Sequence, residues 1–277
     1  YIPVLLGLGD EFVSEIRNDH NPLFPGMKQP EPIEKNLDAL SGTVVSSKAD
    51  LGVAFDGDGD RLGVIDNRGD YINTQQVFSL LTLYLLDIKK QRGPVIKSVT
   101  SSDMITKLSK LYDVPLMETS VGFKHIGPLM MRERAVIGGE ESGGYGFNGH
   151  LPERDGILSC LLFLEFMVCK NMSPSELLTY LHEKVGQYYY KRMDMLYSSG
   201  DDVRMRNLLD DGLKLRDIMG IPVISTDTMD GWRFRFEEGW LVVRFSGTEP
   251  LIRVYAEAMS QNNVDSLLEW TANFLEL

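Results

Sequence analysis

Residues 51–66, LGVAFDGDGDRLGVID, set the architecture from which the rest of the chain can be understood. Two continuous apolar runs, 51–55 and 62–66, are bounded by polar residues, which predicts two buried strands. Between the runs, three aspartates stand at alternate positions with glycines separating them. Because glycine tolerates positive φ and takes little space, the connecting loop can curl until its carboxylates face one point. The sequence therefore predicts two strands joined by a loop that presents a cluster of acidic side chains.

The acidic cluster, Asp56, Asp58 and Asp60, predicts a metal site. Oxygen ligands favour Mg²⁺ or Ca²⁺ over zinc, and a bound cation relieves the repulsion among three like charges. An EF-hand is excluded, because its sixth and twelfth loop positions need Gly and Glu, and this loop has Arg61 and Asn67 there. The Arg61 guanidinium beside the metal would suit a phosphoryl oxygen. The simpler alternative is an ordinary solvated acidic turn.

Outward from this stretch, strand-like and helix-like patterns alternate up to about residue 185. The helices expected there cover 34–45, 73–90, 102–112, 155–170 and a segment starting at 173, and the further strands cover 94–99, 114–118 and 136–139. After residue 187 the pattern changes to a strand at 188–196, a helix at 201–219, a hairpin at 231–245, a strand at 251–258 and a helix at 264–277. We expect α/β domains with mixed sheets, followed by a C-terminal α+β domain.

The composition is that of an acidic globular protein of 277 residues, with a formal net charge of −12 and 43% hydrophobic residues. Nucleic acid is excluded as a general partner, since phosphate backbones require a basic surface. No membrane partner is expected, because the longest apolar run, 157–169, is shorter than the roughly 20 residues of a membrane span. Low cysteine use, with Cys160 and Cys169 expected as small buried side chains, favours the cytoplasm.

Two further polar segments carry chemistry. GGEESGG at 138–144 follows an apolar strand, and its carboxylates and hydroxyl suit paired hydrogen bonds to vicinal sugar hydroxyls, although a plain glycine-rich turn gives the same pattern. RFSGTEP at 244–250, with Arg253 beyond it, offers two arginines, two hydroxyls and a glycine amide that a ligand can approach closely. In an acidic protein this is the cationic nest that a small phosphate needs. Its alternative is a tight turn with two solvent-facing arginines.

Taken together and in this order, the segments resemble those of the α-D-phosphohexomutase family, which includes phosphoglucomutase, phosphomannomutase and phosphoglucosamine mutase. DGDGDR at 56–61 is similar to the family's metal loop, GEESGG at 139–144 to its sugar-recognition loop, and RFSGTEPLIRVY at 244–255 to its phosphate-binding loop. The segments TSVGFK at 119–124 and HLPERDG at 150–156 are also family-like. The resemblance covers essentially the whole chain and implies a mutase acting on a small-molecule sugar phosphate.

The resemblance also implies roles for single residues. The three aspartates would hold Mg²⁺. Catalytic roles would fall to Arg61 beside a phosphoserine, to Lys124 at the substrate's phosphate or in proton transfer, and to His150, a weaker candidate for handling a proton. The residues expected to read the ring hydroxyls and to anchor the phosphate that is not transferred are Glu140, Ser142, Arg244, Ser246, Gly247, Thr248 and Arg253.

By the same resemblance, residues 1–70 would be part of a second mutase domain, 71–186 a third, and 187–277 a C-terminal phosphate-binding domain. The phosphoserine would come from a first domain that this sequence lacks, because Asp19 stands where the family's Ser-His-Asn-Pro-like motif has its serine. That phosphoserine would phosphorylate one end of a hexose monophosphate and recover the group from the other end, through a hexose 1,6-bisphosphate. Glu141 disfavours amino sugars, and Gly144 leans toward glucose phosphate.

Two alternatives stay open. A haloacid-dehalogenase-type phosphatase also has an Asp-x-Asp pair after a buried strand and uses Mg²⁺, with Asp56 as the nucleophile. For that class, however, Asp60 stands where Thr or Val is typical, and the segment 244–253 is left unexplained. The second alternative is a non-catalytic sugar-phosphate-binding module, which the absence of a recognisable nucleophile would fit.

Overall fold

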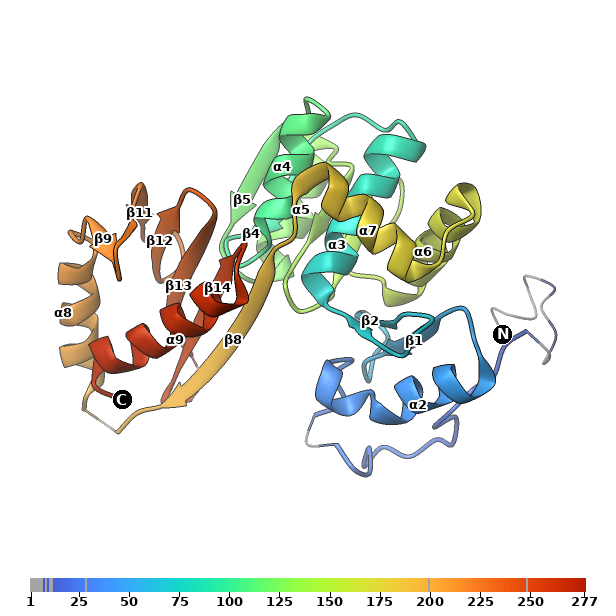
Figure 1. Cartoon of the computed structure of the whole chain (residues 1–277), viewed down its shortest axis with the longest axis horizontal. Helices are drawn as coiled ribbons and strands as arrows, with labels where there is room; N and C mark the ends of the chain where they lie inside the picture. Colours follow the sequence, from blue (N-terminus) through green and yellow to red (C-terminus); the bar gives the residue numbers. More distant parts are fainter. Residues whose placement is uncertain (1–6, 8, 10–11, 28, 199, 248) are drawn as a thin grey trace.

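The computed structural model describes residues 7, 9, 12–27, 29–198, 200–247 and 249–277. Along the chain, the elements form three units, called here the N-terminal unit (up to residue 70), the middle unit (71–186) and the C-terminal unit (187–277). Figure 1 shows the middle unit between the other two, with the N-terminal unit in blue and the C-terminal unit in orange and red. The α/β architecture and the mixed sheets predicted from the sequence are confirmed.

The N-terminal unit is a helix on a small sheet. β1 (Gly52–Phe55) and β2 (Leu62–Ile65) pair as an antiparallel hairpin, and β3 (Tyr71–Ile72), at the start of the middle unit, adds to β2. The helix predicted at 34–45 is divided into a 3₁₀ turn, η1 (Glu34–Asn36), and α2 (Asp38–Ser47). The apolar sequence of residues 1–8 predicts part of a helix, but almost all of this stretch lies outside the described residues.

The middle unit is a four-stranded sheet in the order β5-β4-β6-β7, in which β7 runs antiparallel to its neighbour. Its strands are β4 (Val95–Ser98), β5 (Leu116–Thr119), β6 (Ile137–Gly139) and β7 (Tyr145–Phe147). Its helices are α3 (Thr74–Leu83) with the π-helical continuation η2 (Tyr84–Ile88), α4 (Asp103–Leu111), α5 (Phe123–Glu133), α6 (Gly156–Lys170) and α7 (Pro174–Val185).

Capping residues start these helices where the sequence indicates. Asn73 and Ser173 each form a capping box, in which the side chain accepts from a backbone N–H and a Gln or Glu side chain accepts in return. Ser102 and Asp155 cap α4 and α6 through single side-chain bonds. Helix α5 is one element that the pattern misses, because Pro128 interrupts its apolar period.

The C-terminal unit is a five-stranded antiparallel sheet in the order β11-β12-β13-β14-β8. The strands are β8 (Tyr189–Leu196), β11 (Ser225–Asp227), β12 (Trp232–Phe236), β13 (Gly239–Phe245) and β14 (Leu251–Ala258). Helices α8 (Asp202–Gly212) and α9 (Gln261–Leu275) contact each other, and α9 packs on the sheet. The predicted helix at 201–219 is too long, because a small ribbon of β9 (Asp217–Ile218) and β10 (Ile221–Pro222) follows α8.

Two large hydrophobic cores stabilise the part of the chain that the structure describes. The first joins the N-terminal and middle units, since Leu62 and Val64 of β2 pack in one cluster with helices α3, α6 and α7. The second lies within the C-terminal unit. Cys160 is buried as expected, but the expectation for Cys169 is wrong, because that side chain is exposed near the end of α6.

Among the described residues, no single helix is both long and apolar enough to cross a membrane. Helices α6 and α7 reach that length and apolarity only as a pair, and the pair is bent by 82° at the break between them.

Candidate functional site

The metal loop, residues 56–61, is the turn of the β1–β2 hairpin. One carboxylate oxygen from each of Asp56, Asp58 and Asp60 lies within 4.8 Å of the others, as the sequence predicts for a shared cation. The turn requires Gly59, whose φ is +75°. The Oδ1 atom of Asp60 is buried and has no hydrogen-bond partner among the described residues. A buried carboxylate oxygen that accepts no hydrogen bond, and that lies beside two further carboxylates, fits a hard divalent cation.

Without a cation, this cluster raises the pKa of Asp60 to about 6. Burial is the main cause, and the neighbouring carboxylates of Asp56 and Asp58 add to it, while Arg154 opposes the shift. A site that holds its carboxylates in this way favours a positive charge at the point where they meet.

Arg61 closes the metal loop. Its backbone N–H donates to Asp56 Oδ1 at 3.1 Å, and its Nη1 donates to Glu31 Oε1 at 3.0 Å. Glu31 belongs to the proline-rich segment 19–32, which therefore covers one side of the metal loop. An open pocket of about 440 Å³ lies between this segment and the loop, lined by Phe24, Gln29, Pro30, Glu31, Asp56, Gly57, Asp58 and Arg61.

The sugar-recognition loop connects β6 with β7. Glu140 is 4% exposed, and its Oε1 accepts from the Gly122 backbone N–H at 2.7 Å. Glu141 accepts from the Thr100 hydroxyl at 3.1 Å, and burial together with the Glu140 charge raises the pKa of the Glu141 carboxyl. Ser142 is half-buried at the tip of the loop. The loop thus offers a buried carboxylate and a hydroxyl next to each other.

The metal and sugar loops are joined by backbone hydrogen bonds. The Leu62 N–H donates to Gly143 O at 3.0 Å, and Arg61 pairs with Gly144 in an isolated β-bridge. The metal loop is also bonded to the start of α6, where the Gly156 N–H donates to Gly59 O at 3.1 Å. The two loops, which are far apart in the sequence, are therefore held side by side by their backbones.

Arg154 lies between these two loops, and sequence reasoning did not single it out. Its Nη2 is 2.7 Å from Asp60 Oδ2, and its Nη1 is 4.0 Å from Glu140 Oε2. Gly144 makes room for it, since a Cβ there would lie 2.2 Å from Arg154 Cδ. Its position within the family-like segment 150–156 was the available signal.

The other two predicted catalytic residues lie nearby. Lys124 is exposed in the first turn of α5, two residues after Gly122, whose N–H contacts Glu140. The His150 Nε2 atom is 2.9 Å from Asp155 Oδ2, and Asp155 caps α6 by accepting from the Leu158 N–H. His150 therefore has a structural partner at a helix cap, and its role in proton transfer stays a prediction.

The phosphate loop follows β13 in the C-terminal unit. Arg244 donates from Nε to Asp230 Oδ1 at 2.8 Å, and Arg253 of β14 is its direct cross-strand neighbour. The Arg253 Nε is buried without a hydrogen-bond partner among the described residues. Ser246 is half-buried and Gly247 is exposed, whereas Thr248 lies outside the described residues. Two arginines thus meet at the strand ends from which the loop leaves.

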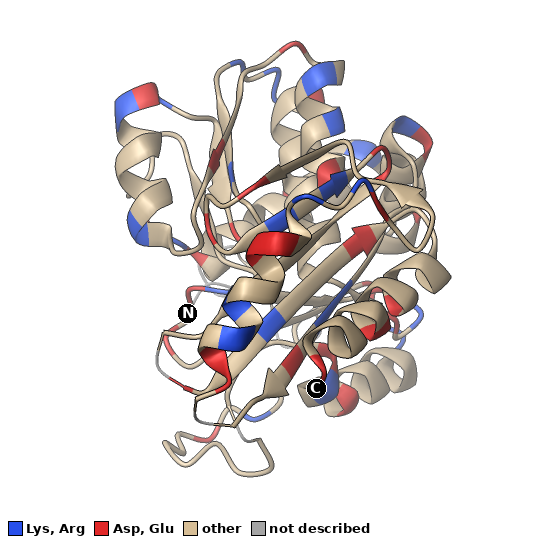
Figure 2. Cartoon of the chain, turned by 90° about the vertical axis from the view of Figure 1, so that its left-hand side faces the viewer, with Lys and Arg blue, Asp and Glu red and all other residues tan. Residues whose placement is uncertain are grey.

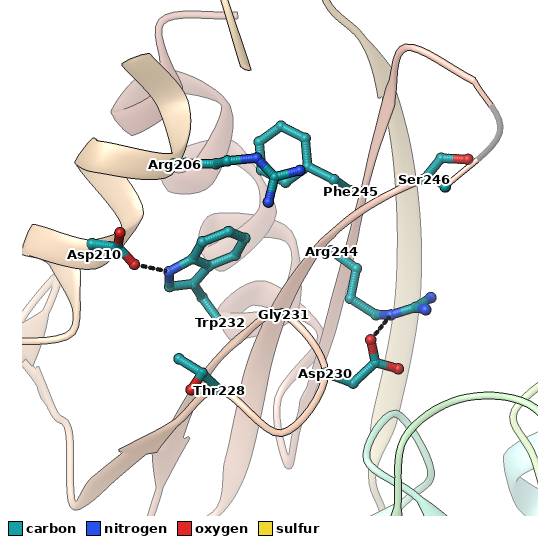
Figure 3. Close-up of a pocket in the computed structure, with 10 residues that line it drawn as sticks. Arg206, Asp210, Thr228, Asp230, Gly231, Trp232, Arg244, Phe245 and Ser246 are labelled. Carbon is teal, nitrogen blue, oxygen red and sulfur yellow. Dashed lines mark hydrogen bonds and ion pairs between the residues drawn. The ribbon is translucent and has the colours of Figure 1, made fainter. Parts of the chain in front are cut away.

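An open pocket of about 480 Å³ lies beside this loop (Figure 3). The Arg206 guanidinium of α8 stacks over the Phe245 ring at 4.1 Å, and Trp232 Nε1 donates to Asp210 at 2.7 Å. Figure 2 faces the C-terminal unit and shows basic and acidic positions interspersed over it. The arginines near the phosphate loop therefore form a local cationic site and not part of a general basic surface.

The middle and C-terminal units meet across a network of buried charges. The Lys97 Nζ, 1% exposed, is 3.4 Å from Asp103 Oδ1 and 3.5 Å from Glu118 Oε1. From the C-terminal unit, Arg233 donates twice to Glu118 at 3.0 Å, and Arg235 donates to Asp103 at 3.0 Å. Burial acts to raise the pKa of both carboxyls, but Lys97 and the arginines outweigh it, so both pKa values are lowered.

Glu257 of β14 completes this interface and has no exposed surface. Its Oε1 accepts from the Asp103 N–H at 2.7 Å and from Trp240 Nε1 at 3.1 Å, while Oε2 is buried without a hydrogen-bond partner among the described residues. Burial, and then the Asp103 charge, raise the pKa of Glu257 to about 7.

Comparisons with known proteins identify the family. Three family profiles match successive parts of the chain: phosphoglucomutase/phosphomannomutase alpha/beta/alpha domain II at residues 3–69, alpha/beta/alpha domain III at 73–185 and the C-terminal domain at 203–273.

Named relatives span the same region. A phosphoglucomutase/phosphomannomutase from Thermococcus kodakarensis is 31% identical over 253 residues, which cover 91% of this chain and 53% of the relative. A phosphoglucosamine mutase from Methanocaldococcus jannaschii is 32% identical over 247 residues, covering 87% and 52%. The crystal structure of a candidate phosphomannomutase from Thermus thermophilus superposes with a TM-score of 0.80 at 33% identity, covering 95% of this chain and 54% of that one.

The chain spans about half the length of these relatives. The three matched ranges contain residues 56–61, 139–144 and 244–255, respectively. The chain belongs to the α-D-phosphohexomutase family, the family of the phosphoglucomutases and phosphomannomutases.

Proposed function

We propose that this chain supplies the metal centre, the sugar-recognition loop and the phosphate anchor of a phosphohexomutase that interconverts hexose 1-phosphate and hexose 6-phosphate. One observation carries the proposal. The metal loop and the sugar loop share backbone hydrogen bonds and the bridging Arg154, and Arg244 is joined to the same region through Asp230. Three segments that are far apart in the sequence thus bring together side chains that suit the sugar and the phosphate of one sugar phosphate.

The chemistry follows from charge and position. Phosphoryl transfer relies on placing the reacting oxygens and on neutralising the charge of the group in flight. Mg²⁺ held by Asp56, Asp58 and Asp60 would neutralise charge at the transferred group, and the Arg61 and Arg154 guanidinium groups beside it are oriented by the same carboxylates. Their fixed positive charges require little reorganisation when the phosphoryl group arrives.

The remaining residues would hold the sugar in either orientation. Glu140 and Ser142 would bind a pair of ring hydroxyls, and a pair of equivalent hydroxyls can be presented from either end of the ring. Arg244, Arg253 and the loop between them would hold the phosphate that is not transferred. The phosphoserine donor and the hexose 1,6-bisphosphate intermediate belong to the proposal for the whole protein, because this chain spans half of its relatives.

For the substrate, we propose glucose phosphate. The relatives include both phosphoglucomutases/phosphomannomutases and phosphoglucosamine mutases, so the family assignment leaves the sugar open. By the family resemblance, Glu141 disfavours an amino sugar, and Gly144 favours glucose phosphate over mannose phosphate. The phosphatase alternative has lost its support, since the family assignment accounts for the segment 244–253 that it left unexplained.

Calorimetric titration of the chain with glucose 6-phosphate in Mg²⁺ tests the proposal. We expect saturable binding that Arg244→Gln weakens at least about tenfold, because a charge-assisted hydrogen bond to phosphate is lost. Arg132→Gln is the matched control, since Arg132 is 72% exposed and pairs with its neighbour Glu133 on the surface. Equal binding by the Arg244 and Arg132 variants, or no binding by the unaltered chain, would refute the proposal.

A turnover assay distinguishes the enzyme from a binding module. We expect ³¹P NMR to show conversion of glucose 1-phosphate to glucose 6-phosphate by the protein that carries this chain together with the phosphoserine segment. Binding without any conversion by that protein would support the non-catalytic module instead.

A further inference from the structure

Asp230 lies in the turn between β11 and β12, and its two carboxylate oxygens accept from two different units. Oδ1 accepts from Arg244 Nε at 2.8 Å within the C-terminal unit, as Figure 3 shows. Oδ2 accepts from the backbone N–H of Val121 in the middle unit at 2.7 Å. A second bond supports the contact, in which the Ser120 hydroxyl donates to Met229 O at 3.1 Å.

The bond to Nε orients the arginine for a ligand. A guanidinium has five N–H donors in a rigid plane, and Asp230 uses the one on Nε. The two terminal nitrogens stay in the same plane, and this pair is the fork that binds a phosphate with two parallel hydrogen bonds. Asp230 therefore fixes the direction in which the arginine presents that fork.

The other oxygen of Asp230 leads to the sugar-recognition loop. Val121 is followed by Gly122, and the Gly122 N–H donates to Glu140 Oε1 at 2.7 Å. Consecutive residues are held about 3.8 Å apart by covalent geometry. A short relay, Arg244–Asp230–Val121/Gly122–Glu140, thus connects the phosphate anchor with the carboxylate proposed to read the sugar.

We propose that Asp230 is a positioning residue that sets the separation between the phosphate anchor and the sugar-reading carboxylate, and so matches the site to a hexose phosphate. The inference rests on the proposed function, because it assigns the two ends of the relay to the two parts of that substrate. Asp230 itself touches neither part. Its effect is to let Arg244 and Glu140 contact the phosphate and the sugar of the same ligand at the same time.

The chemistry of the side chain explains why a carboxylate stands here. An ionised aspartate accepts hydrogen bonds on both oxygens, and Asp230 meets one N–H donor with each of them. Asparagine has the same size but offers an oxygen on one side and an NH₂ donor on the other. Asp230→Asn can therefore serve Arg244 or Val121, but not both.

Two affinities measured on the full 277-residue chain test this role: one for inorganic phosphate and one for glucose 6-phosphate, both in Mg²⁺. The affinity for glucose 6-phosphate divided by the affinity for inorganic phosphate measures how much the sugar adds to binding. We expect Asp230→Asn to reduce this ratio by about tenfold, since misplacing one end of a paired site by about an ångström is costly. Glu140→Gln should also reduce the ratio, and the double variant should lose little more than either single one.

Amide NMR supplies a second readout. In the unaltered chain, inorganic phosphate alone should shift the Val121 and Gly122 amide resonances, because phosphate at Arg244 acts on them through Asp230. Asp230→Asn should abolish these shifts. Asp211→Asn is the control, since Asp211 is 79% exposed and pairs with Lys214 on the surface.

Three outcomes would overturn the inference. If Asp230→Asn lowers the affinities for phosphate and for glucose 6-phosphate by the same factor, Asp230 only orients Arg244 and the inference fails. If the ratio and the amide shifts are unchanged in a variant with native circular dichroism, the inference fails as well. If the unaltered chain binds neither ligand, the proposed function fails and takes the inference with it.

Discussion

The middle unit meets its two neighbours in different ways. Toward the N-terminal unit it shares a hydrophobic core, in which Leu62 and Val64 of β2 pack with α3 and α6. Toward the C-terminal unit, Tyr188 and Met259 also pack with this core. Beside them lie hydrogen bonds and ion pairs, in which Lys97, Asp103 and Glu118 face arginines across the interface. The C-terminal unit has a separate hydrophobic core of its own.

This difference shows how the site is divided. The metal and sugar loops lie on the first interface and are held by the packing of one core, which is dense and tolerates little movement. The phosphate anchor is attached through groups whose interactions depend on geometry, on protonation and on salt. We therefore expect the two interfaces to respond differently to substitution, pH and ionic strength.

The largest expected effect is on the shared core. Leu62→Ala should lower the free energy of unfolding by about 3 kcal/mol, because it removes a fully buried side chain and leaves a cavity. Urea unfolding followed by circular dichroism measures this. Leu196→Ala is the control, since Leu196 is 77% exposed. A loss as small as that of the control would mean that the N-terminal and middle units do not share a core.

The next effect is on the charged interface. Arg233→Met should lower the free energy of unfolding by about 2 kcal/mol, because it removes two charge-assisted hydrogen bonds to Glu118 and one to Asp227. The loss should be local. Hydrogen exchange should accelerate in β12 and β5 while β2 stays protected. Uniform acceleration over all three strands would show that the two interfaces are not independent.

A smaller effect concerns pH. Burial raises the pKa of Glu257 to about 7, above its value of 4.5 in an exposed chain, so the folded state binds the proton more tightly than the unfolded state. Stability from this group is complete below pH 4.5 and is lost as the pH rises through 7. Asp103 and Glu118, whose pKa values are lowered, stay ionised throughout this window.

Glu257→Gln should remove this dependence. We expect the unfolding free energy of the unaltered chain to fall between about pH 5 and about pH 8 relative to that of the variant. Comparing the two chains cancels the contributions of Asp60, whose pKa is raised, and of His182, whose pKa burial lowers. If the unfolding free energies of both chains depend on pH in the same way, the raised pKa of Glu257 is contradicted.

The smallest effect is that of salt. Raising NaCl from about 0.1 M to about 1 M shortens the screening length from about 10 Å to about 3 Å, but the interface charges are mostly buried. Hydrogen exchange at the charged interface should therefore report a loss below about 1 kcal/mol, and none at the shared core. If salt lowered stability more at the shared core than at the charged interface, the proposed difference between the two interfaces would be contradicted.

The sequence predicted the parts of this structure that depend on local patterns. The strands at 51–55 and 62–66 and the helix starts at Asn73, Ser102 and Ser173 were recognisable because their signals are contained within a few residues. Helix α5 was missed because Gly127 and Pro128 weaken its local signal, and tertiary packing around Ile126 overrides them.

The site was predictable as three loops but not as one assembly. No local pattern shows that Arg154 lies between Asp60 and Glu140, because this depends on how α6 packs against the β1–β2 hairpin. The same holds for Asp230, which meets Val121 only through the docking of the C-terminal unit. Long-range contacts of this kind leave no periodicity in the sequence.

A crystal structure of this chain with Mg²⁺ and glucose 6-phosphate would test the shared site most directly. We predict one sugar phosphate in the site, with its ring hydroxyls at Glu140 and its phosphate at Arg244, and a magnesium ion among Asp56, Asp58 and Asp60. A metal ion and a sugar ester bound in unrelated clefts, or a phosphate that leaves Arg244 uncontacted, would contradict this assignment.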